Sequence, residues 1–264
     1  MKLSIITPCY NSGKFLLEML ESVRKFHGNI PYEIIIVDDG STDIETLEIL
    51  DTIKDNTDIK LIRQKNQGAN AARNKGCQSA AGKYLLFLDS DNRILENFIS
   101  KGIEKLETDE NTDIVYGKPV FFGDIGKRTF STGPFDINRL LVESYIDMCS
   151  IVRKTVWEKV GGLDESKNLA RLQDWEFYLN IYKHKGGFYY FNEFFYEYRI
   201  SSGSITATVS NDKTEIAKRY IFNKHLELFE SCLRRLYYHE KILKDSKDYK
   251  LGKLLLSPFR LFRK

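Results

Sequence analysis

The chain has no apolar run long enough to cross a membrane and no cysteine pair spaced as in metal or redox motifs. A spanning helix needs about 20 consecutive apolar residues, and no stretch of this sequence approaches that length. The apolar run within residues 1–11 is far too short for a signal peptide. Cys9, Cys77, Cys149 and Cys232 lie far apart, which argues against a zinc site and a disulfide framework. We therefore expect reduced thiols in a cytoplasmic protein.

The sequence also lacks an internal repeat, a low-complexity segment and a Gly/Ser-rich linker, and none of its four histidines neighbours a motif. Its apolar share of 42% and charged share of 29% are ordinary for a globular protein. The 15 tyrosines and 17 phenylalanines favour a core that contains a sheet. We expect one α/β domain over residues 1–205 and a helical extension over residues 206–264 with a basic amphipathic tail.

Positive charge is concentrated at the C-terminus. Residues 241–264 contain eight Lys and Arg against two Asp, a net of +6, whereas the whole chain carries only +3. Bulky apolar side chains alternate with these charges, which is typical of a segment that binds an anionic membrane surface. A helix packed on the body or on a partner, and a solvated tail, are the alternatives. No recognisable nucleic-acid-binding motif accompanies the basic residues, so we expect no nucleic-acid partner.

The first hundred residues alternate short apolar runs with amphipathic helical patterns. The runs predict buried strands at residues 3–7, 33–37, 59–63 and 84–88, and the segments between them predict helices at residues 15–25, 44–54 and 69–80. This alternation is typical of a parallel sheet with helices on both faces, in which ligands bind at the carboxyl ends of the strands. After residue 110 the patterns are shorter, until residues 213–244 predict one long amphipathic helix.

Carboxylates follow two of the predicted strands. Asp89 and Asp91 come after the fourth strand, where two carboxylates one residue apart can share Mg²⁺ or Mn²⁺ with diphosphate oxygens. Asp38 and Asp39 follow the second strand, and their mutual repulsion requires donors such as a base N–H, a ribose hydroxyl or an arginine. A solvated turn is the alternative in both places, with Asp43 as the N-cap of the next helix.

Gly68 and Arg73 follow the third predicted strand. Gly68 allows a tight entry into a helix whose N-terminal N–H groups attract phosphate. Arg73 falls on the second turn of that helix, where its guanidinium could make a bidentate contact with a diphosphate. An ordinary arginine on a surface helix is the alternative.

Together these residues form an ordered series of motifs. The series is T-P-x-Y-N (Thr7, Pro8, Tyr10, Asn11), V-D-D-G-S-T-D (Val37–Asp43), N-x-G-x-x-x-A-R-N (Asn66–Asn74), L-D-S-D (Leu88–Asp91) and Q-D-W-E (Gln173–Glu176). It resembles the family-2 inverting glycosyltransferases of the GT-A fold, with a mostly parallel central sheet covered by helices. The resemblance covers roughly residues 1–205 and implies a nucleotide-binding half at about 1–91 and an acceptor half at about 92–205.

The resemblance implies a role for each motif in binding the nucleotide-sugar. Thr7, Tyr10 and Asp39 would hold the base and ribose, with Asp39 accepting from a uracil-like N–H. Arg73 would approach the diphosphate or brace Asp39, while Asp38 would support the loop. The set implied to bind the nucleotide-sugar is Thr7, Pro8, Tyr10, Asn11, Asp39, Gly68, Arg73 and Asp89.

The resemblance also implies the metal ligands and the base. Asp89 would face the ribose and the metal, and Asp91 would ligate Mn²⁺ or Mg²⁺ directly. Asp174 would be the general base that activates the acceptor hydroxyl. Without the other motifs, the better interpretation of Asp174 would be a helix N-cap. Trp175, beside Asp174, is a candidate for acceptor contact.

Two positions depart from the family pattern. Gln173 stands where the family usually has a glutamate before the base, which implies a different charge environment for Asp174. Ser201 stands where the family usually has a histidine after the Tyr198-Arg199 pair, although Ser204 of the same pattern is present. The resemblance therefore does not supply a third protein ligand to the metal.

The sequence predicts transfer of a sugar from a nucleotide-diphosphate sugar to a glycan or lipid-linked acceptor in cell-surface polysaccharide synthesis. We expect the donor to be a UDP-sugar. We expect a cytoplasmic enzyme that can be peripheral on the inner face of the cell membrane. A sugar-nucleotide nucleotidyltransferase is an alternative, but residues 7–11 lack its Gly-rich basic loop. A non-catalytic nucleotide-sugar-binding protein is the other, supported only by Gln173 and Ser201.

Overall fold

The computed structural model describes residues 1–124, 130–201, 209–251 and 253, and the chain divides into two compact units. The first unit is Met1–Ile221 and the second is Phe222–Lys264. The predicted boundary near residue 205 falls within residues 202–208, outside the described residues, and stays a prediction.

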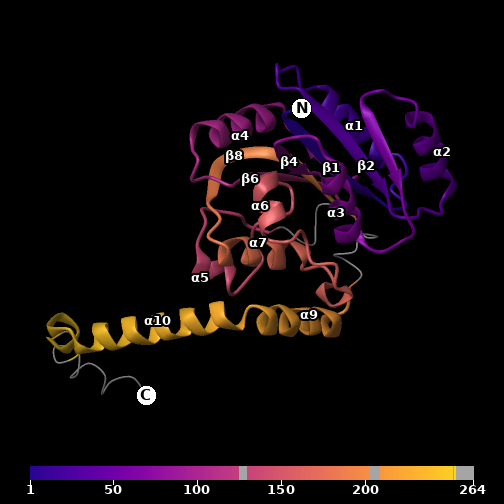
Figure 1. Ribbon diagram of the computed structural model, residues 1–264. Coiled ribbons are helices and arrows are strands. Elements are labelled where there is room, and N and C mark those ends of the chain that lie inside the picture. Colours follow the sequence, from indigo (N-terminus) through magenta and orange to yellow (C-terminus); the bar gives the residue numbers. More distant parts are fainter. Residues whose placement is uncertain (125–129, 202–208, 252, 254–264) are drawn as a thin grey trace. The chain divides into compact units, whose positions relative to one another are not determined.

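An eight-stranded sheet forms the centre of the first unit (Figure 1). Its strands are β1 (Leu3–Cys9), β2 (Tyr32–Asp38), β3 (Ile59–Arg63), β4 (Tyr84–Phe87), β5 (Arg93–Ile94), β6 (Ile114–Gly123), β7 (Ile151–Arg153) and β8 (Phe188–Ile200). The strand order is β3-β2-β1-β4-β7-β6-β8-β5, and the first four are parallel neighbours. These four are the strands that the sequence predicts, because each is a short run dominated by apolar residues. Strands β1, β2 and β4 are largely buried, whereas β3, at the edge of the sheet, has Lys60 and Arg63 exposed.

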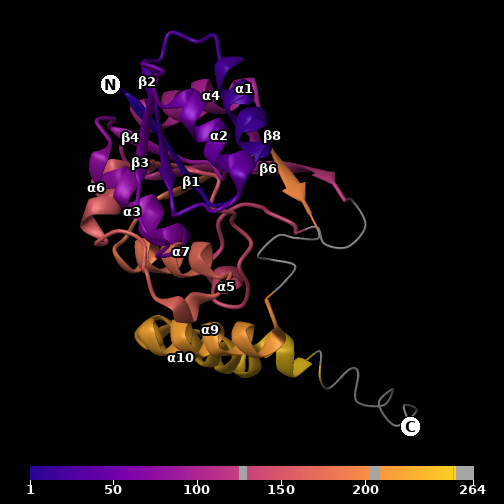
Figure 2. The same ribbon diagram turned by 90° about the vertical axis from the view of Figure 1, so that its right-hand side faces the viewer.

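Helices cover both faces of the sheet (Figure 2). The helices of the first unit are α1 (Phe15–Arg24), α2 (Ile44–Ile53), α3 (Ala69–Ser79), α4 (Glu96–Thr108), α5 (Ile137–Leu140), α6 (Lys154–Lys159) and α7 (Gln173–Lys183), with a short 3-10 helix at Lys167–Leu169. Apolar side chains of α1, α2 and α4 pack together against one face. On the other face, the ring of Phe177 in α7 lies 5.8 Å from the ring of Phe87 in β4. Alternate strand residues thus fill two layers of core.

The end of the chain departs from the predicted single helix. Two helices, α9 (Asn211–Lys224) and α10 (Leu226–Asp245), replace it, because His225 leaves the helical conformation at φ −113° and ψ 25°. The prediction of one continuous helix over residues 213–244 was therefore wrong. Within the described residues, no helix has both the length and the apolar character needed to span a membrane. All four cysteines are buried and free, as the sequence predicts.

Close packing of α3 on the sheet depends on Gly76. A Cβ at this position would lie 2.7 Å from Cγ2 of buried Ile6 and 3.4 Å from Cγ2 of Val37. We predict that Gly76→Val lowers the free energy of unfolding by roughly 1–3 kcal/mol through overpacking. Urea unfolding of this variant beside Lys75→Val, an exposed neighbour on the same helix, checks the prediction. Equal losses in the two variants would contradict it.

Candidate active site

The carboxyl ends of the parallel strands meet at one edge of the sheet, as the sequence predicts. The Asp39 N–H donates to the Cys9 carbonyl at 2.8 Å, and the Leu88 N–H donates to the Ile6 carbonyl at 3.1 Å. Thr7 lies inside β1 rather than after it, with its side chain fully buried and its hydroxyl 4.0 Å from the Met19 sulfur. The Thr7 side chain therefore has no exposed surface with which to contact a nucleotide, and its predicted role stays untested.

Asn11 joins the first two loops at this edge. Its backbone has φ 51°, and its side-chain oxygen accepts from the Thr42 N–H at 2.8 Å and the Asp43 N–H at 3.2 Å. Pro8 is half-buried, and Tyr10 is 50% exposed beside it. In the structure Asn11 therefore holds the two loops together. Tyr10 is the side chain of the T-P-x-Y-N motif that is exposed and accessible to a ligand.

Asp38 and Asp39 are both buried, and each accepts hydrogen bonds from backbone N–H groups. Asp38 Oδ1 accepts from the Ser41 N–H at 2.9 Å, which is the loop-supporting role that the motif implies. Asp39 accepts from Gln64 Nε2 at 2.8 Å, the Gln67 N–H at 2.9 Å and the Gly68 N–H at 2.8 Å. These donors stabilise the buried Asp39 carboxylate and fix Gly68, whose φ of 98° suits glycine, at the start of α3.

Arg73 forms an ion pair with Asp89. Its Nη2 donates to Asp89 Oδ1 at 2.5 Å, and its Nη1 donates to Asn70 Oδ1 at 3.1 Å. The arginine is 6% exposed, and its Nε is buried without a hydrogen-bond partner among the described residues. In this conformation the guanidinium lies on Asp89 and does not brace Asp39. A buried cation is thereby held at the end of β4, beside the L-D-S-D motif.

Asp91 is held by its backbone rather than by its carboxylate. Arg199, at the end of β8, donates from Nε to the Asp91 carbonyl at 3.0 Å and from Nη2 to Glu18 Oε2 at 2.5 Å. Burial, and then the negative charge of Asp89, raise the pKa of the Asp91 carboxyl to about 6. Ser201 follows β8 directly, and Ser204 lies outside the described residues.

The carboxylates of Asp89 and Asp91 fit a divalent cation that takes its other ligands from a nucleotide. The described residues contain no group of three or more His, Cys, Asp or Glu side chains arranged to hold a metal. Two crowded carboxylates, one with a raised pKa, are nevertheless stabilised by an added cation. Mg²⁺ commonly binds through one or two carboxylates together with substrate phosphates. The two carboxylates therefore fit the predicted Mn²⁺ or Mg²⁺, and the metal site stays a prediction.

Asp174 is the second residue of α7 and is not its N-cap, which is Leu172. Its Oδ1 accepts from the Trp175 N–H at 2.7 Å. Burial raises the pKa of the Asp174 carboxyl to about 6, although the side chain keeps some exposed surface. The charges of Arg73 and Asp89 act on it in opposite directions. The structure thus brings Asp174 within electrostatic range of the ion pair at the end of β4.

Trp175 faces the protein interior. It is 6% exposed, and its Nε1 donates to the Leu140 carbonyl. One turn later on α7, the Tyr178 hydroxyl contacts the Asp147 carbonyl at 2.7 Å and Ser150 Oγ at 2.9 Å. Both side chains hold α7 in place, and the predicted acceptor contact of Trp175 stays untested.

Asp147 is a further candidate for the site, which the sequence does not indicate. Burial, and then the charge of Asp89, raise the pKa of its carboxyl to about 7, and Asp174 adds to the shift. Its Oδ1 accepts from the Cys149 N–H at 2.9 Å. The only signal in the sequence is an acidic residue shortly before the short apolar strand β7, which is too weak to single it out.

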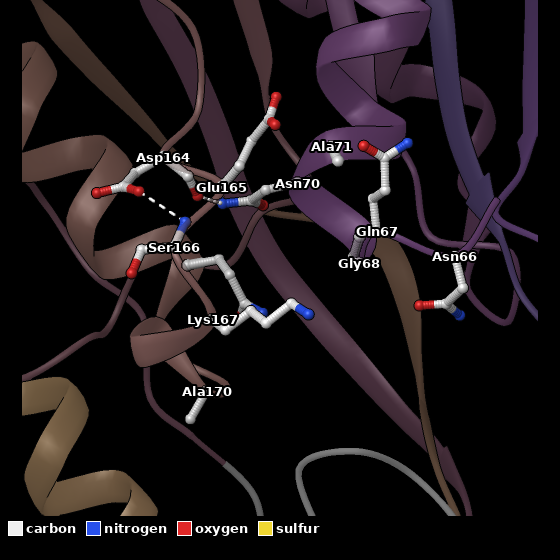
Figure 3. A pocket seen from close by; sticks show the side chains of 12 residues that line it. Asn66, Gln67, Gly68, Asn70, Ala71, Asp164, Glu165, Ser166, Lys167 and Ala170 are labelled. Atoms are coloured by element: carbon white, nitrogen blue, oxygen red, sulfur yellow. Dashed lines mark hydrogen bonds between the residues drawn. The ribbon is translucent and has the colours of Figure 1, made fainter. Parts of the chain in front are cut away.

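A pocket of about 300 Å³ opens between the start of α3 and the segment before α7 (Figure 3). Asn66, Gln67 and Gly68 lie on one side, and Asp164, Ser166, Lys167 and Ala170 lie on the other. Gln173, the neighbour of Asp174, also lines it. The pocket therefore joins the predicted phosphate-binding helix to the helix of the predicted base.

Two asparagines of α3 hold the segment that walls this pocket. Asn70 donates to the Asp164 carbonyl at 2.7 Å while accepting from Arg73. Asn74 donates to the Leu163 carbonyl at 2.8 Å and to Glu165 Oε1 at 2.7 Å. The motif that supplies Arg73 to Asp89 thus also positions residues 163–165 through its two asparagines, a connection that linear spacing does not reveal.

Solved structures show the same fold. Residues covering 88% of this chain align with 73% of S. aureus TarS 1–349 in complex with UDP-GlcNAc, at a TM-score of 0.66 and 21% identity. The same protein in complex with UDP aligns at a TM-score of 0.61. This likeness confirms the predicted GT-A fold.

Relatives in sequence are glycosyltransferases. Glycosyltransferase GlyG of Streptococcus pneumoniae is 39% identical over 119 residues, which are 44% of this chain and 38% of GlyG. An uncharacterized glycosyltransferase of Rickettsia felis is 40% identical over 107 residues, 40% of this chain and 17% of that protein. The chain thus spans well under two thirds of the length of these relatives.

The family match covers the nucleotide motifs. Residues 4–168 match the family described as glycosyl transferase family 2, a range that includes Asp39, Arg73, Asp89 and Asp91 and ends before Asp174. The match covers more than half of the chain and agrees with the resemblance that the motifs predict. The chain belongs to glycosyl transferase family 2.

Proposed function

We propose that this chain transfers a sugar from a nucleoside-diphosphate sugar to an acceptor hydroxyl with inversion, and that Asp174 is the general base. The observation that carries the proposal is the position of Asp174 at the start of α7, next to Gln173, which lines the same pocket as the start of α3. A carboxylate thereby lies near the strand edge where the family motifs converge. Inverting transfer requires one base at the acceptor side. The acceptor hydroxyl attacks directly, so no protein nucleophile is needed.

The residues around Asp174 suit it to accept a proton. The Trp175 N–H occupies Oδ1, and Ser144 donates to the same carboxyl. A pKa near 6 leaves the group ionised at neutral pH yet more basic than an ordinary aspartate, which favours proton transfer from a hydroxyl. The hydrogen bonds of Trp175 and Tyr178 anchor α7, the helix that carries Asp174.

The opposite side of the site is suited to a leaving diphosphate. Arg73 supplies a buried positive charge, and α3 begins at Gly68 without an acidic residue in its first turn. Asp89 and Asp91 would hold Mn²⁺ or Mg²⁺, which stabilises negative charge on a departing phosphate. Asp39, with two donors bound to Oδ1 and one to Oδ2, keeps one lone pair on Oδ2 that can accept from a base N–H.

Similar proteins support the choice of donor. The TarS structures of the same fold contain UDP-GlcNAc or UDP, which makes a UDP-sugar the first donor to test for this chain. The relatives are named glycosyltransferases, and for this chain we propose a glycan or lipid-linked acceptor and a part in cell-surface polysaccharide synthesis.

The proposal predicts the effect of removing the base. Asp174→Asn should lower turnover by about 10²–10⁴, or roughly 3–5 kcal/mol of barrier, since the amide cannot accept the proton. Donor affinity should barely change, because Asp174 does not bind the nucleotide. Turnover of UDP-sugar and calorimetric UDP binding check this, with exposed Asp58→Asn as the control. Near-normal turnover in the mutant would remove Asp174 as the base.

The pKa of Asp174 predicts a pH dependence. Only the carboxylate can accept a proton, so kcat should rise with pH through about 6 and level off above it. Measuring kcat with saturating donor from about pH 5 to about pH 8 separates this ionisation from donor binding. A kcat that stays constant down to about pH 5 would contradict the assignment.

The pair of carboxylates predicts a metal-dependent loss of affinity. Asp91→Ala should weaken nucleotide-sugar binding measured with Mn²⁺ much more than binding measured with EDTA, because the variant loses a ligand only when metal is present. Calorimetry in both conditions measures this. Equal losses with Mn²⁺ and with EDTA would remove Asp91 as a metal ligand.

The basic tail predicts binding to anionic membranes. A polybasic segment gains about 1 kcal/mol per Lys or Arg near an anionic surface, and salt screens this attraction. Residues 252 and 254–264 of the tail lie outside the described residues. We propose that the full chain sediments with anionic vesicles at low salt and that removing residues 246–264 abolishes this without affecting donor hydrolysis. Vesicle binding by the truncated chain, or its unfolding, would contradict the proposal.

A further inference from the structure

Arg199 belongs to a sequence motif that the proposed function leaves without a role. It is the second residue of the Tyr198-Arg199 pair and lies at the end of β8, beside the loop that carries Asp89 and Asp91. Its side chain is only 11% exposed. Arg199 Nε donates to the Asp91 carbonyl at 3.0 Å, and Nη2 donates to Glu18 Oε2 at 2.5 Å. A single side chain therefore links this loop to α1.

Two aromatic rings contact the same guanidinium. Its carbon lies 4.1 Å from the centre of the Phe15 ring and 4.3 Å from the centre of the Phe122 ring. Arginine suits this position because its flat, rigid group stacks on aromatic rings while its N–H groups donate in different directions. Stacking and hydrogen bonds together restrict the Arg199 side chain to one conformation, in which it holds the Asp91 carbonyl.

The backbone of Arg199 holds the same loop at a second point. Its N–H donates to Asn92 Oδ1 at 2.9 Å, and Asn92 is only 2% exposed. The Asn92 N–H in turn donates to the Asp89 carbonyl at 3.1 Å, which closes a turn from Asp89 to Asn92. Both carboxylates of the L-D-S-D motif therefore lie in one short turn that is tied to the end of β8.

A metal site with few protein ligands depends on the groups that orient those ligands. The Asp89 carboxylate is paired with Arg73, whereas Asp91 is held through its backbone carbonyl. We propose that Arg199 is a positioning residue, which keeps Asp91 beside Asp89 in the arrangement that binds Mn²⁺ or Mg²⁺ together with the nucleotide diphosphate. Arg199 acts through the backbone of Asp91 and is not itself a ligand. This inference rests on the metal site of the proposed function.

Arg93 offers a matched control within the same cluster. Its guanidinium carbon lies 4.1 Å from the centre of the Phe122 ring, and its nitrogens lie 3.5 Å from Glu18 Oε2 and 2.7 Å from Glu197 Oε2. Among the hydrogen bonds and ion pairs of the described residues, none joins the Arg93 side chain to Asp91. Substituting Arg93 thus removes a stacked and paired arginine without releasing the Asp91 carbonyl.

Calorimetric binding of UDP in Mn²⁺ and in EDTA tests the proposal. Arg199→Gln should weaken UDP binding about 10-fold or more in Mn²⁺, as expected when a group that orients a metal ligand is removed, and should leave binding in EDTA close to that of the wild type. A higher Mn²⁺ concentration should restore most of the lost affinity, because both carboxylates remain. Arg93→Gln should bind UDP as the wild type does in both conditions. Thermal unfolding confirms that each variant is folded.

Asp91→Ala separates a failure of this inference from a failure of the metal site. Wild-type UDP binding that is equal in Mn²⁺ and in EDTA overturns both. If Asp91→Ala loses affinity only in Mn²⁺ while Arg199→Gln loses none, or loses equally in both conditions, the role of Arg199 alone is overturned. Equal losses in Arg199→Gln and Arg93→Gln have the same meaning. If Arg199→Gln does not fold, Glu18→Gln takes its place, with a smaller loss expected in Mn²⁺ only and wild-type binding as the contrary result.

Discussion

The ion pair between Arg73 and Asp89 is the interaction on which the rest of the site depends. It connects the second turn of α3 to the end of β4, the next element along the chain, through a 2.5 Å contact of a nearly buried guanidinium. Breaking a buried pair leaves an uncompensated charge, which is strongly destabilising. Through Asn70 the same arginine is linked to the segment that walls the pocket before α7. One cation therefore contacts the end of β4 and, through Asn70, the wall of the pocket next to the predicted base.

Carboxylates crowd around this cation, and the crowding gives the site its chemistry. Asp91, Asp147 and Asp174 all have pKa values raised by burial, and in each case the charge of Asp89 contributes in the same direction. Such a cluster favours the binding of cations and makes its members better proton acceptors than exposed aspartates. A nucleotide-sugar with a divalent cation would bring the positive charge that the cluster lacks.

The sequence predicts the nucleotide-binding half well, because its strands are short apolar runs and its motifs follow them directly. It predicts the acceptor half poorly, since the pieces of β8 are interrupted by polar residues and α9 ends only because His225 leaves the helical conformation. Asp147 and the contacts of Asn74 are invisible in the sequence, because they depend on elements about 90 residues apart in the chain, or on a short segment without a recognisable motif. Gly68 and Asp43, by contrast, have the backbone roles that their residue types predict.

The central claim is that the sugar is transferred with inversion by a base acting directly on the acceptor. Water can serve as that acceptor, so the claim is testable before the natural acceptor is known. We would follow hydrolysis of UDP-GlcNAc, whose sugar is α-linked, by time-resolved NMR of the anomeric proton. Inversion predicts that the β anomer is released first and that the α anomer appears only as the free sugar equilibrates. Initial release of the α anomer would contradict the account.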